Sequence, residues 1–341
     1  MSESYLEWMA RQTITTWWND SADPQEMQRA LGWGATGATT NPVLSAQALK
    51  GRADYWRPIV QAISGSLKGE ARAEAVMQAV VSDVARALLP TFERSSGVQG
   101  YACAQVNPGR AGDREGMLAE ARRFHLWAPN IAVKLPVTSA GLDVMEECAA
   151  AGITFTATVS FTSAQLLAVA ERNARGRSRA LAAGVTPGRC FVAMMIGRLD
   201  DYLREVAQDQ RVGLNESDIP QAGLAVVKRC YQLYCERSYE ACIIVAALRG
   251  TYHITELVGA RVIMSVHPTN QQKIQAPGIA RELGIERPIP ADVLARLQRL
   301  PEFVRAYDPD ALQPADFVTF GVTQRTLSQF VESGWKLLES T

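Results

Sequence analysis

One lysine stands inside an otherwise apolar segment, IAVKLP (131–136), and it carries the clearest chemical signal in the chain. If this segment is a strand whose Val133 and Leu135 face outward, Lys134 points to the inner side. Burial disfavours the charged form of lysine, and moving its pKa from about 10.4 to about 7 costs roughly 4–5 kcal/mol. A neutral amine can attack a carbonyl to form a Schiff base, so we expect a catalytic role. The structural alternative is an internal ion pair with Asp20.

Two arginines supply a second chemical theme. Arg198 and Arg249 each follow a predicted strand, and their guanidinium groups could converge on one phosphate through bidentate hydrogen bonds. Each could instead be a surface arginine at the start of a helix. Polar residues recur at the ends of the other predicted strands as well, and the whole set is Asp20, Thr39, Thr40, Asn41, Gln105, Asn107, Lys134, Thr156, Thr158, Ser160, Arg198, Arg249 and His267.

The elements that must position these residues alternate between short apolar runs and segments with helical periodicity. We expect strands over residues 14–18, 35–39, 98–105, 131–135, 153–159, 189–196, 241–247 and 261–266. Helices are expected over residues 24–31, 44–49, 70–92, 113–126, 140–151, 163–172, 200–208, 218–237, 252–257 and 271–283. Residues 173–188 are rich in arginine and glycine and are interpreted as a surface loop, with a phosphate-gripping lid as the alternative.

Eight strands that are each followed by a helix predict an α/β fold of the (β/α)8 TIM-barrel type. A doubly wound open sheet is less favoured, because no G-x-G-x-x-G motif follows the first strand. We expect a single domain over residues 1–341, with the barrel over about 14–285. A helical extension over about 288–341 has two helices, 291–304 and 323–338, which would pack over the barrel or form an oligomer contact.

Composition narrows the functional classes. The chain has 341 residues, equal numbers of basic and acidic residues (35 each), and 47% hydrophobic residues, so a nucleic-acid partner is not expected. No apolar run reaches the ~18–20 residues of a membrane span, and the N-terminal residues lack a signal-like stretch, which predicts a cytoplasmic protein. Six scattered cysteines and three distant histidines predict neither disulfides nor a metal site. The oligomeric state is open, and a homo-oligomer is possible in principle.

Several segments resemble the transaldolase family of Schiff-base barrels, including its smaller fructose-6-phosphate aldolase branch. The resemblance is carried in order from about Ile14 to Pro268 by GATGATTNPVLSAQAL (34–49), CAQVNPGRAGDREGMLAEARR (103–123), VKLPVTSAGLDVMEECAAAGITFTATVSFTSAQ (133–165) and FVAMMIGRLDD (191–201). It implies a carbohydrate enzyme of the pentose phosphate pathway type that acts on a sugar or sugar phosphate without a cofactor or metal. No nucleic acid or membrane partner is implied.

The same resemblance assigns roles to individual residues. Lys134 would be the Schiff-base lysine and Asp20 an acid/base residue of the first strand. Gln105 and Thr158 would complete the catalytic set, with Thr158 and Asn41 also orienting substrate. Thr40 and Thr156 stand at neighbouring substrate-side positions, and Arg198 and Arg249 would hold the substrate phosphate.

This chain departs from the family pattern at several of these positions. Gln105 replaces the glutamate of transaldolases, and an amide can orient water but cannot exchange a proton near neutral pH. Thr156 replaces an asparagine and Ala193 a serine, which removes donors to the sugar hydroxyls. Gln105 and Ala193 match the aldolase branch, but that branch's strand-six tyrosine is Met195 here and its phosphate-side lysine is Arg249.

Three functions remain open. The first is a transaldolase-like enzyme that transfers a dihydroxyacetone unit through a lysine Schiff base, using Asp20 and a water held by Gln105 to move protons. The second is a fructose-6-phosphate-aldolase-like or specialised biosynthetic aldolase, suggested by Trp17 and Trp18 beside Asp20, although we expect both tryptophans to be packing residues. The third is a non-catalytic sugar-phosphate-binding protein that keeps the two arginines.

Overall fold

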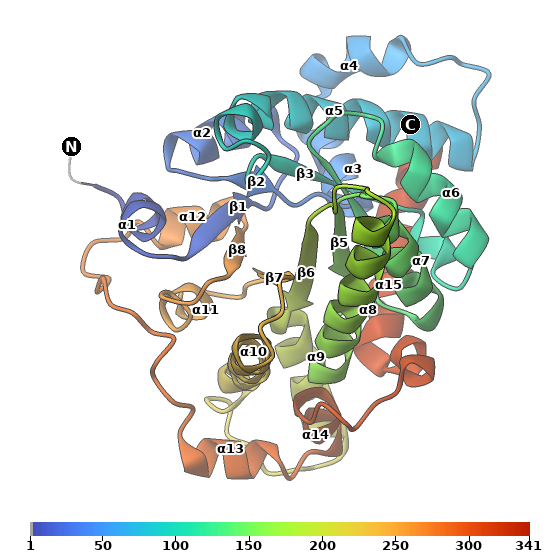
Figure 1. The fold of residues 1–341 in the computed structure, drawn as a ribbon. Coiled ribbons are helices and arrows are strands. Elements are labelled where there is room, and N and C mark those ends of the chain that lie inside the picture. Colours follow the sequence, from blue (N-terminus) through green and yellow to red (C-terminus); the bar gives the residue numbers. More distant parts are fainter. Residues whose placement is uncertain (1–2) are drawn as a thin grey trace.

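The computed structural model describes residues 3–341 and contains a closed barrel of eight parallel strands surrounded by helices (Figure 1). Each strand pairs with the next along the chain, and β8 pairs with β1 to close the ring. The strands are β1 (Thr16–Asn19), β2 (Gly37–Ala38), β3 (Tyr101–Gln105), β4 (Ile131–Pro136), β5 (Phe155–Thr158), β6 (Cys190–Met195), β7 (Cys242–Ala246) and β8 (Ile263–Val266). All eight overlap with the expected segments, and the (β/α)8 barrel is confirmed.

Several of the helices that cover the strands begin at a residue whose side chain caps the helix. Asp23 accepts hydrogen bonds at the start of α2, Thr138 at the start of α7 and Thr162 at the start of α8. The elements up to the end of the barrel are α1 (Tyr5–Gln12), α2 (Pro24–Gly32), α3 (Pro42–Gly51), α4 (Ala53–Gln61), α5 (Glu70–Arg94), η1 (Pro108–Arg110), α6 (Arg114–Phe124), α7 (Ser139–Ala150), α8 (Ser163–Ala182), α9 (Ile196–Asp209), α10 (Ile219–Glu236), α11 (Tyr252–Thr255) and α12 (Pro268–Lys273). Helices α1 and α4 were not expected from the sequence.

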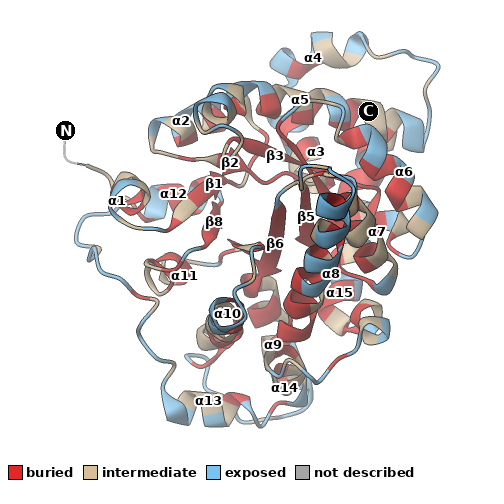
Figure 2. Cartoon of the chain, in the orientation of Figure 1, coloured by how far each residue is buried: buried red, intermediate tan, exposed pale blue. Residues whose placement is uncertain are grey.

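Aromatic side chains pack inside the barrel. The ring of Phe191 lies 4.9 Å from that of Trp18 and 5.4 Å from that of Tyr101, both in edge-on geometry. A Cβ added to Gly37 would lie 2.5 Å from the Trp18 ring, so β2 can pass the indole only with glycine there. Figure 2 shows the strands as buried along their length. Trp17 and Trp18 are both fully enclosed, which confirms that they are packing residues.

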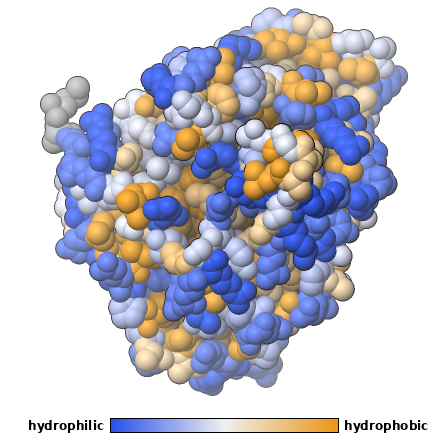
Figure 3. All heavy atoms as spheres, in the orientation of Figure 1, coloured by the Kyte–Doolittle hydropathy of each residue, from blue (hydrophilic) through white to orange (hydrophobic). Residues whose placement is uncertain are grey.

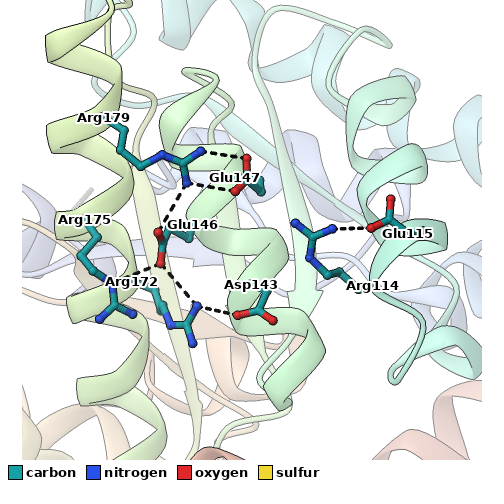
Figure 4. A network of polar contacts seen from close by, with 8 residues as sticks. All are labelled: Arg114, Glu115, Asp143, Glu146, Glu147, Arg172, Arg175 and Arg179. Atoms are coloured by element: carbon teal, nitrogen blue, oxygen red, sulfur yellow. Dashed lines mark hydrogen bonds and ion pairs between the residues drawn. The ribbon is translucent and has the colours of Figure 1, made fainter.

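The expected loop over residues 173–188 is wrong for its first ten residues, because α8 continues to Ala182. Arginines at helical spacing on α8 reach the acidic face of α7 instead of solvent or a phosphate (Figure 4). Arg172 pairs with Asp143 and Glu146, and Arg179 pairs with Glu147 at 2.9 Å. The loop interpretation therefore holds only for residues 183–188, and the α8 arginines shown in Figure 4 are engaged with α7, which does not support the lid.

The helix expected over residues 271–283 is largely wrong as well. Helix α12 starts earlier, at Pro268, and ends at Lys273, and residues 279–284 have no helical structure. Pro277 and Gly278 interrupt the pattern, and Gly278 has a φ of +87°, outside the helical region.

The C-terminal extension is made of short helices that return to the barrel. They are α13 (Ala291–Leu297), α14 (Pro301–Tyr307), η2 (Pro314–Thr319), α15 (Gly321–Phe330), the π-helical turn η3 (Val331–Trp335) and α16 (Lys336–Glu339). The two helices expected here are therefore each divided. The η3 turn contacts α3, where a Cβ on Gly334 would lie 2.7 Å from the backbone nitrogen of Val43. This close approach fixes the C-terminal segment beside the start of α3.

Helix α5 is the one described helix that is long and apolar enough by composition to cross a bilayer. Its buried residues recur at helical spacing on one side, from Ala73 through Val80 to Leu88, and the helix lies against β3 (Figure 1). This is the pattern of a helix that covers a barrel. The face of the molecule drawn in Figure 3 is mostly hydrophilic with scattered apolar residues.

Candidate active site

A pocket of about 250 Å³ opens at the carboxyl ends of the barrel strands. Its wall contains polar residues that follow β1, β2, β7 and β8, together with residues on β4, β5 and α9. Gln329 and Phe330 of α15 complete the wall, so the C-terminal extension contributes to the site. The sequence predicted that this extension could pack over the barrel but did not identify the two residues. Carboxyl strand ends are where TIM-barrel enzymes hold their reacting groups.

Lys134 lies in this pocket with 5% of its surface exposed. Its Nζ donates a hydrogen bond to the backbone carbonyl of Thr40 at 3.0 Å. Burial lowers the pKa of Lys134, and the positive charge of Arg198 lowers it further, although Cys103 and Asp20 act in the opposite direction. The amine is therefore shifted toward its neutral, nucleophilic form. The sequence left open an ion pair between Lys134 and Asp20, but in the structure the hydrogen-bond acceptor of Nζ is the Thr40 carbonyl.

Two residues expected to contact substrate have other partners in the structure. The Thr40 hydroxyl bonds to the backbone carbonyl of Cys103 at 2.5 Å, and its own carbonyl holds Lys134. The Thr156 hydroxyl faces Cys103 Sγ at 3.4 Å, inside the barrel. Neither residue lines the pocket. Thr40 thus holds the lysine through its backbone, and Thr156 is paired in strand register with Lys134.

Asp20 ends a short chain of hydroxyl groups. Thr39 Oγ1 donates to Asp20 Oδ1 at 2.7 Å, and the same Thr39 oxygen lies 2.6 Å from Ser265 Oγ. Because Thr39 donates to the carboxylate, Ser265 must donate to Thr39. All three residues line the pocket, and the carboxylate is held by Thr39, which is held in turn by Ser265. Ser265 was not singled out from the sequence.

Gln105 and Thr158 flank the lysine with unused hydrogen-bonding atoms. Gln105 is 2% exposed and pairs in register with Lys134, and Thr158 lines the pocket from β5. Within residues 3–341, Gln105 Oε1 and Thr158 Oγ1 are buried without a hydrogen-bond partner. Buried polar atoms are normally satisfied by protein or by water. Thr158 Oγ1 is therefore available to a bound water or a substrate hydroxyl in the pocket, and Gln105 Oε1, which belongs to a residue outside the pocket wall, is available to a buried water.

Arg198 and Arg249 line the same pocket, as the two-arginine hypothesis requires. Arg249 forms an ion pair with Asp201 at 2.8 Å, and Arg198 stands 5.4 Å from the Phe330 ring centre while it donates to Gln329. Burial and the neighbouring charge of Arg249 lower the pKa of Arg198. A concentration of positive charge that lacks a full set of counterions favours an anionic ligand.

Close packing between α9 and the segment after β7 brings the two arginines together. A Cβ on Gly197 would lie 2.1 Å from the carbonyl oxygen of Ala247, so only glycine permits the contact. His253 accepts the backbone N–H of Arg249 on Nδ1 at 3.2 Å and has Nε2 3.0 Å from buried Asp200. These supports were missed in the sequence. The sequence signal that could have indicated them is the pair of acidic residues Asp200 and Asp201 that follows Arg198.

Asn41 lies at the pocket as the N-cap of α3, where its Oδ1 accepts the Leu44 N–H at 3.0 Å. Its Nδ2 has no hydrogen-bond partner among the described residues and remains available as a donor. Ala193 and Met195 form an apolar part of the wall on β6. The family has a serine and, in the aldolase branch, a tyrosine at these positions, and β6 of this chain contains no other residue with a hydroxyl group that could take their place.

The described residues contain no cluster of three or more histidine, cysteine, aspartate or glutamate side chains suited to a metal ion. All six cysteines are free.

Comparison with known proteins places these features in a family context. The family model described as Transaldolase/Fructose-6-phosphate aldolase matches residues 17–302. A transaldolase of Thiobacillus denitrificans is 29% identical over 90% of this chain and 88% of its own length. A transaldolase of Neisseria gonorrhoeae is 30% identical over 61% of this chain and 58% of its own length. A probable transaldolase of Dehalococcoides mccartyi is 27% identical over 77% of this chain and 93% of its own length.

Proposed function

This chain belongs to the transaldolase/fructose-6-phosphate aldolase family and is an enzyme of the transaldolase type, and we propose that it cleaves and forms a C–C bond of a ketose through a Schiff base on Lys134. The single observation that supports this most is the buried amine itself, which lines a pocket and has its pKa lowered by burial. A lysine placed in this way is suited to attack a carbonyl.

The proposed steps use groups that line or support the pocket. Lys134 Nζ adds to the C2 carbonyl, whose oxygen leaves as water, with a water held by Gln105 and Thr158 moving the protons. Asp20 then takes the proton of the C4 hydroxyl, the C3–C4 bond breaks, and its electrons pass to the iminium nitrogen to give an enamine. The C4 fragment departs as an aldehyde.

The fate of the enamine decides the outcome. Addition to an acceptor aldehyde, followed by hydrolysis, transfers a dihydroxyacetone unit, whereas protonation at C3 and hydrolysis releases dihydroxyacetone as an aldolase would. Gln105 and Ala193 remove the acid and the hydroxyl expected of the transferase subgroup, which favours a partial aldolase outcome, whereas Met195 lacks the tyrosine expected of the aldolase branch. We retain transfer as the primary proposal because the relatives with broad coverage carry the transaldolase name.

We propose a sugar phosphate as the substrate class. Arg198 and Arg249 line the same pocket as Lys134 and Asp20, and a phosphate accepts bidentate hydrogen bonds from arginine. Because all six cysteines are free, we also expect the enzyme to act in a reducing compartment such as the cytoplasm.

Borohydride reduction in the presence of ketoses and ketose phosphates tests the proposal. We expect a stable adduct on Lys134, identified by peptide mass spectrometry, and no adduct in Lys134→Met. Failure of every ketose tested to label the wild-type chain would overturn the Schiff-base proposal.

Calorimetric measurement of ketose phosphate binding, combined with assays of turnover, distinguishes an enzyme from a non-catalytic sugar-phosphate-binding protein. For an enzyme we expect wild-type turnover of at least one ketose phosphate, with Lys134→Met abolishing turnover while Arg198-dependent binding persists. Binding without turnover in the wild type, unchanged by Lys134→Met, would instead indicate a binding protein. Product analysis with and without an acceptor aldehyde then distinguishes transfer from aldol cleavage.

A further inference from the structure

His267 lines the same pocket as Lys134 and Asp20, yet the proposed reaction gives it no task. It follows β8 directly, and β8 pairs with β1 in the register Trp18 to Ser265 and Asn19 to Val266. Asp20 N donates to Val266 O at 3.1 Å, which continues the ladder. Asp20 and His267 therefore occupy neighbouring positions at the carboxyl ends of adjacent strands.

The inward positions of these two strands agree with this placement. Ser265 contacts Thr39, which contacts Asp20, so Ser265 and Asp20 face the barrel mouth. Side chains two residues apart on a strand share a face, which puts His267 on the side of Ser265. His267 is exposed at the pocket wall, beside Asp20 in the strand register.

The proton position on the imidazole is set by its neighbour. His267 Nδ1 accepts the backbone N–H of Thr269 at 3.3 Å, as the cap of α12. A neutral imidazole that accepts on Nδ1 carries its hydrogen on Nε2. His267 in this arrangement is a hydrogen-bond donor through Nε2 and holds no free acceptor nitrogen.

We propose that His267 is a further catalytic residue, which donates an Nε2–H hydrogen bond to the oxygen on C4 while Asp20 moves the proton of that oxygen. This inference rests on the proposed Schiff-base cleavage. A neutral imidazole that donates to a carbonyl oxygen polarises it and stabilises the charge that develops there.

The proton and electron balance is simple. In cleavage, the C4 hydroxyl proton passes to the Asp20 carboxylate, the C3–C4 electron pair passes to the iminium, and the new aldehyde oxygen keeps the hydrogen bond from His267. In the reverse direction, aldol addition, the enamine attacks the aldehyde that His267 polarises, and protonated Asp20 returns the proton to the oxygen. His267 gives up no proton in either direction.

Two variants separate this role from the capping role. Asparagine is a preferred N-cap and can keep the bond from Thr269, but it has no atom at the position of Nε2. Glutamine reaches the position of Nε2 with an amide donor. We expect His267→Asn to fold normally and to lower kcat for ketose cleavage by about 10- to 100-fold, and His267→Gln to retain more of the rate than His267→Asn.

The controls distinguish a failure of this inference from a failure of the Schiff-base proposal. Dihydroxyacetone can form the imine but cannot undergo the cleavage, so its borohydride trapping on Lys134 should be equal in wild type, His267→Asn and His267→Gln. His125→Gln, a change of a histidine on the outer helix α6 side, should leave both cleavage and trapping unchanged. Normal trapping with full cleavage activity in His267→Asn would overturn the role of His267, whereas absent trapping in the wild type would overturn the Schiff base itself.

Discussion

At the scale of single residues, neighbouring charges in the pocket shift the pKa of Lys134 in opposite directions. Burial lowers the pKa of the lysine most, Cys103 and the negative charge of Asp20 raise it, and the positive charge of Arg198 lowers it further. The arginine would thus serve two functions in the proposed reaction, because we also propose that it binds the anionic group of the substrate.

Removing the charge of Arg198 should therefore change the amine. In Arg198→Gln we expect the pH profile for borohydride trapping of uncharged dihydroxyacetone to move to higher pH, with several-fold less trapping near neutrality. The sign follows because the neutral amine reacts, and loss of a nearby cation favours the protonated form. Trapping rate against pH measures the shift, and the use of an uncharged ketone excludes effects on phosphate binding.

Arg204→Gln is the matched control, since Arg204 lies on the same helix but pairs with Asp201 and Glu216 and does not line the pocket. Its profile should coincide with that of the wild type. A profile of Arg198→Gln that stays in place or moves to lower pH would contradict the electrostatic account of the lysine.

The sequence predicted part of this site and missed part of it for a physical reason. Lys134, Asp20 and the two arginines were found because charge in or after an apolar strand is unusual. Gln329 and Phe330 were missed because they come from a distant helix whose path depends on the contact between Gly334 and the start of α3. Thr40 was assigned to substrate, and only the three-dimensional contact reveals that its backbone holds the lysine.

At the scale of elements, the strands were predictable and two intervening segments were not. Eight apolar runs identify eight strands whatever their exact ends, because buried parallel strands are apolar on both faces. Residues 173–182 misled the prediction because Gly176 and several arginines are typical of a loop. The structure explains both, since Arg175 and Arg179 pair with Glu146 and Glu147 of α7 and the glycine allows α7 and α8 to touch.

The packing role of Gly176 yields a prediction with a definite sign. A Cβ there would lie 2.5 Å from both Ala149 Cβ and the Glu146 carbonyl oxygen of α7. We expect Gly176→Ala to lower the free energy of unfolding by about 1–3 kcal/mol, because the clash with backbone outweighs the better helix propensity of alanine. Chemical denaturation measures the change.

Gly51→Ala is the control, because it adds a Cβ to another helix at a position where there is space for it. Gly51 is the last residue of α3, and a Cβ there would have no heavy atom within 4 Å. The same substitution should be neutral or stabilise by up to about 1 kcal/mol. Equal effects at the two glycines would show that helix propensity alone governs residue 176 and that the close contact of α7 with α8 is not energetically important.

At the scale of the whole molecule, one buried carboxyl outside the pocket couples global stability to pH. Glu120 on α6 is 5% exposed, and its Oε2 accepts the backbone N–H of Asn107, which follows β3, at 2.8 Å. Burial raises the pKa of Glu120 to about 7, although Arg110 lies 3.6 Å from Oε1 and acts in the opposite direction. The carboxyl joins a covering helix to the barrel and is not part of the proposed chemistry.

The direction of the pH effect follows from proton linkage. An unfolded glutamate titrates near ~4.3, so between that pH and about 7 the folded chain binds more protons than the unfolded chain. The contribution of Glu120 to stability is therefore fully present below about pH 4 and is lost as pH rises through 7. Glu120→Gln keeps an acceptor for Asn107 and has no proton to lose, so it should gain stability relative to the wild type as pH rises.

We expect the free energy of unfolding of Glu120→Gln minus that of the wild type to increase by about 1–3 kcal/mol between pH 5 and pH 8. Urea denaturation at a series of pH values measures this difference. Glu115→Gln, on the same helix but with an exposed side chain, should give a difference that stays constant with pH. A constant or falling difference for Glu120→Gln would mean that the ion pair with Arg110 outweighs burial and keeps the carboxylate ionised throughout this range.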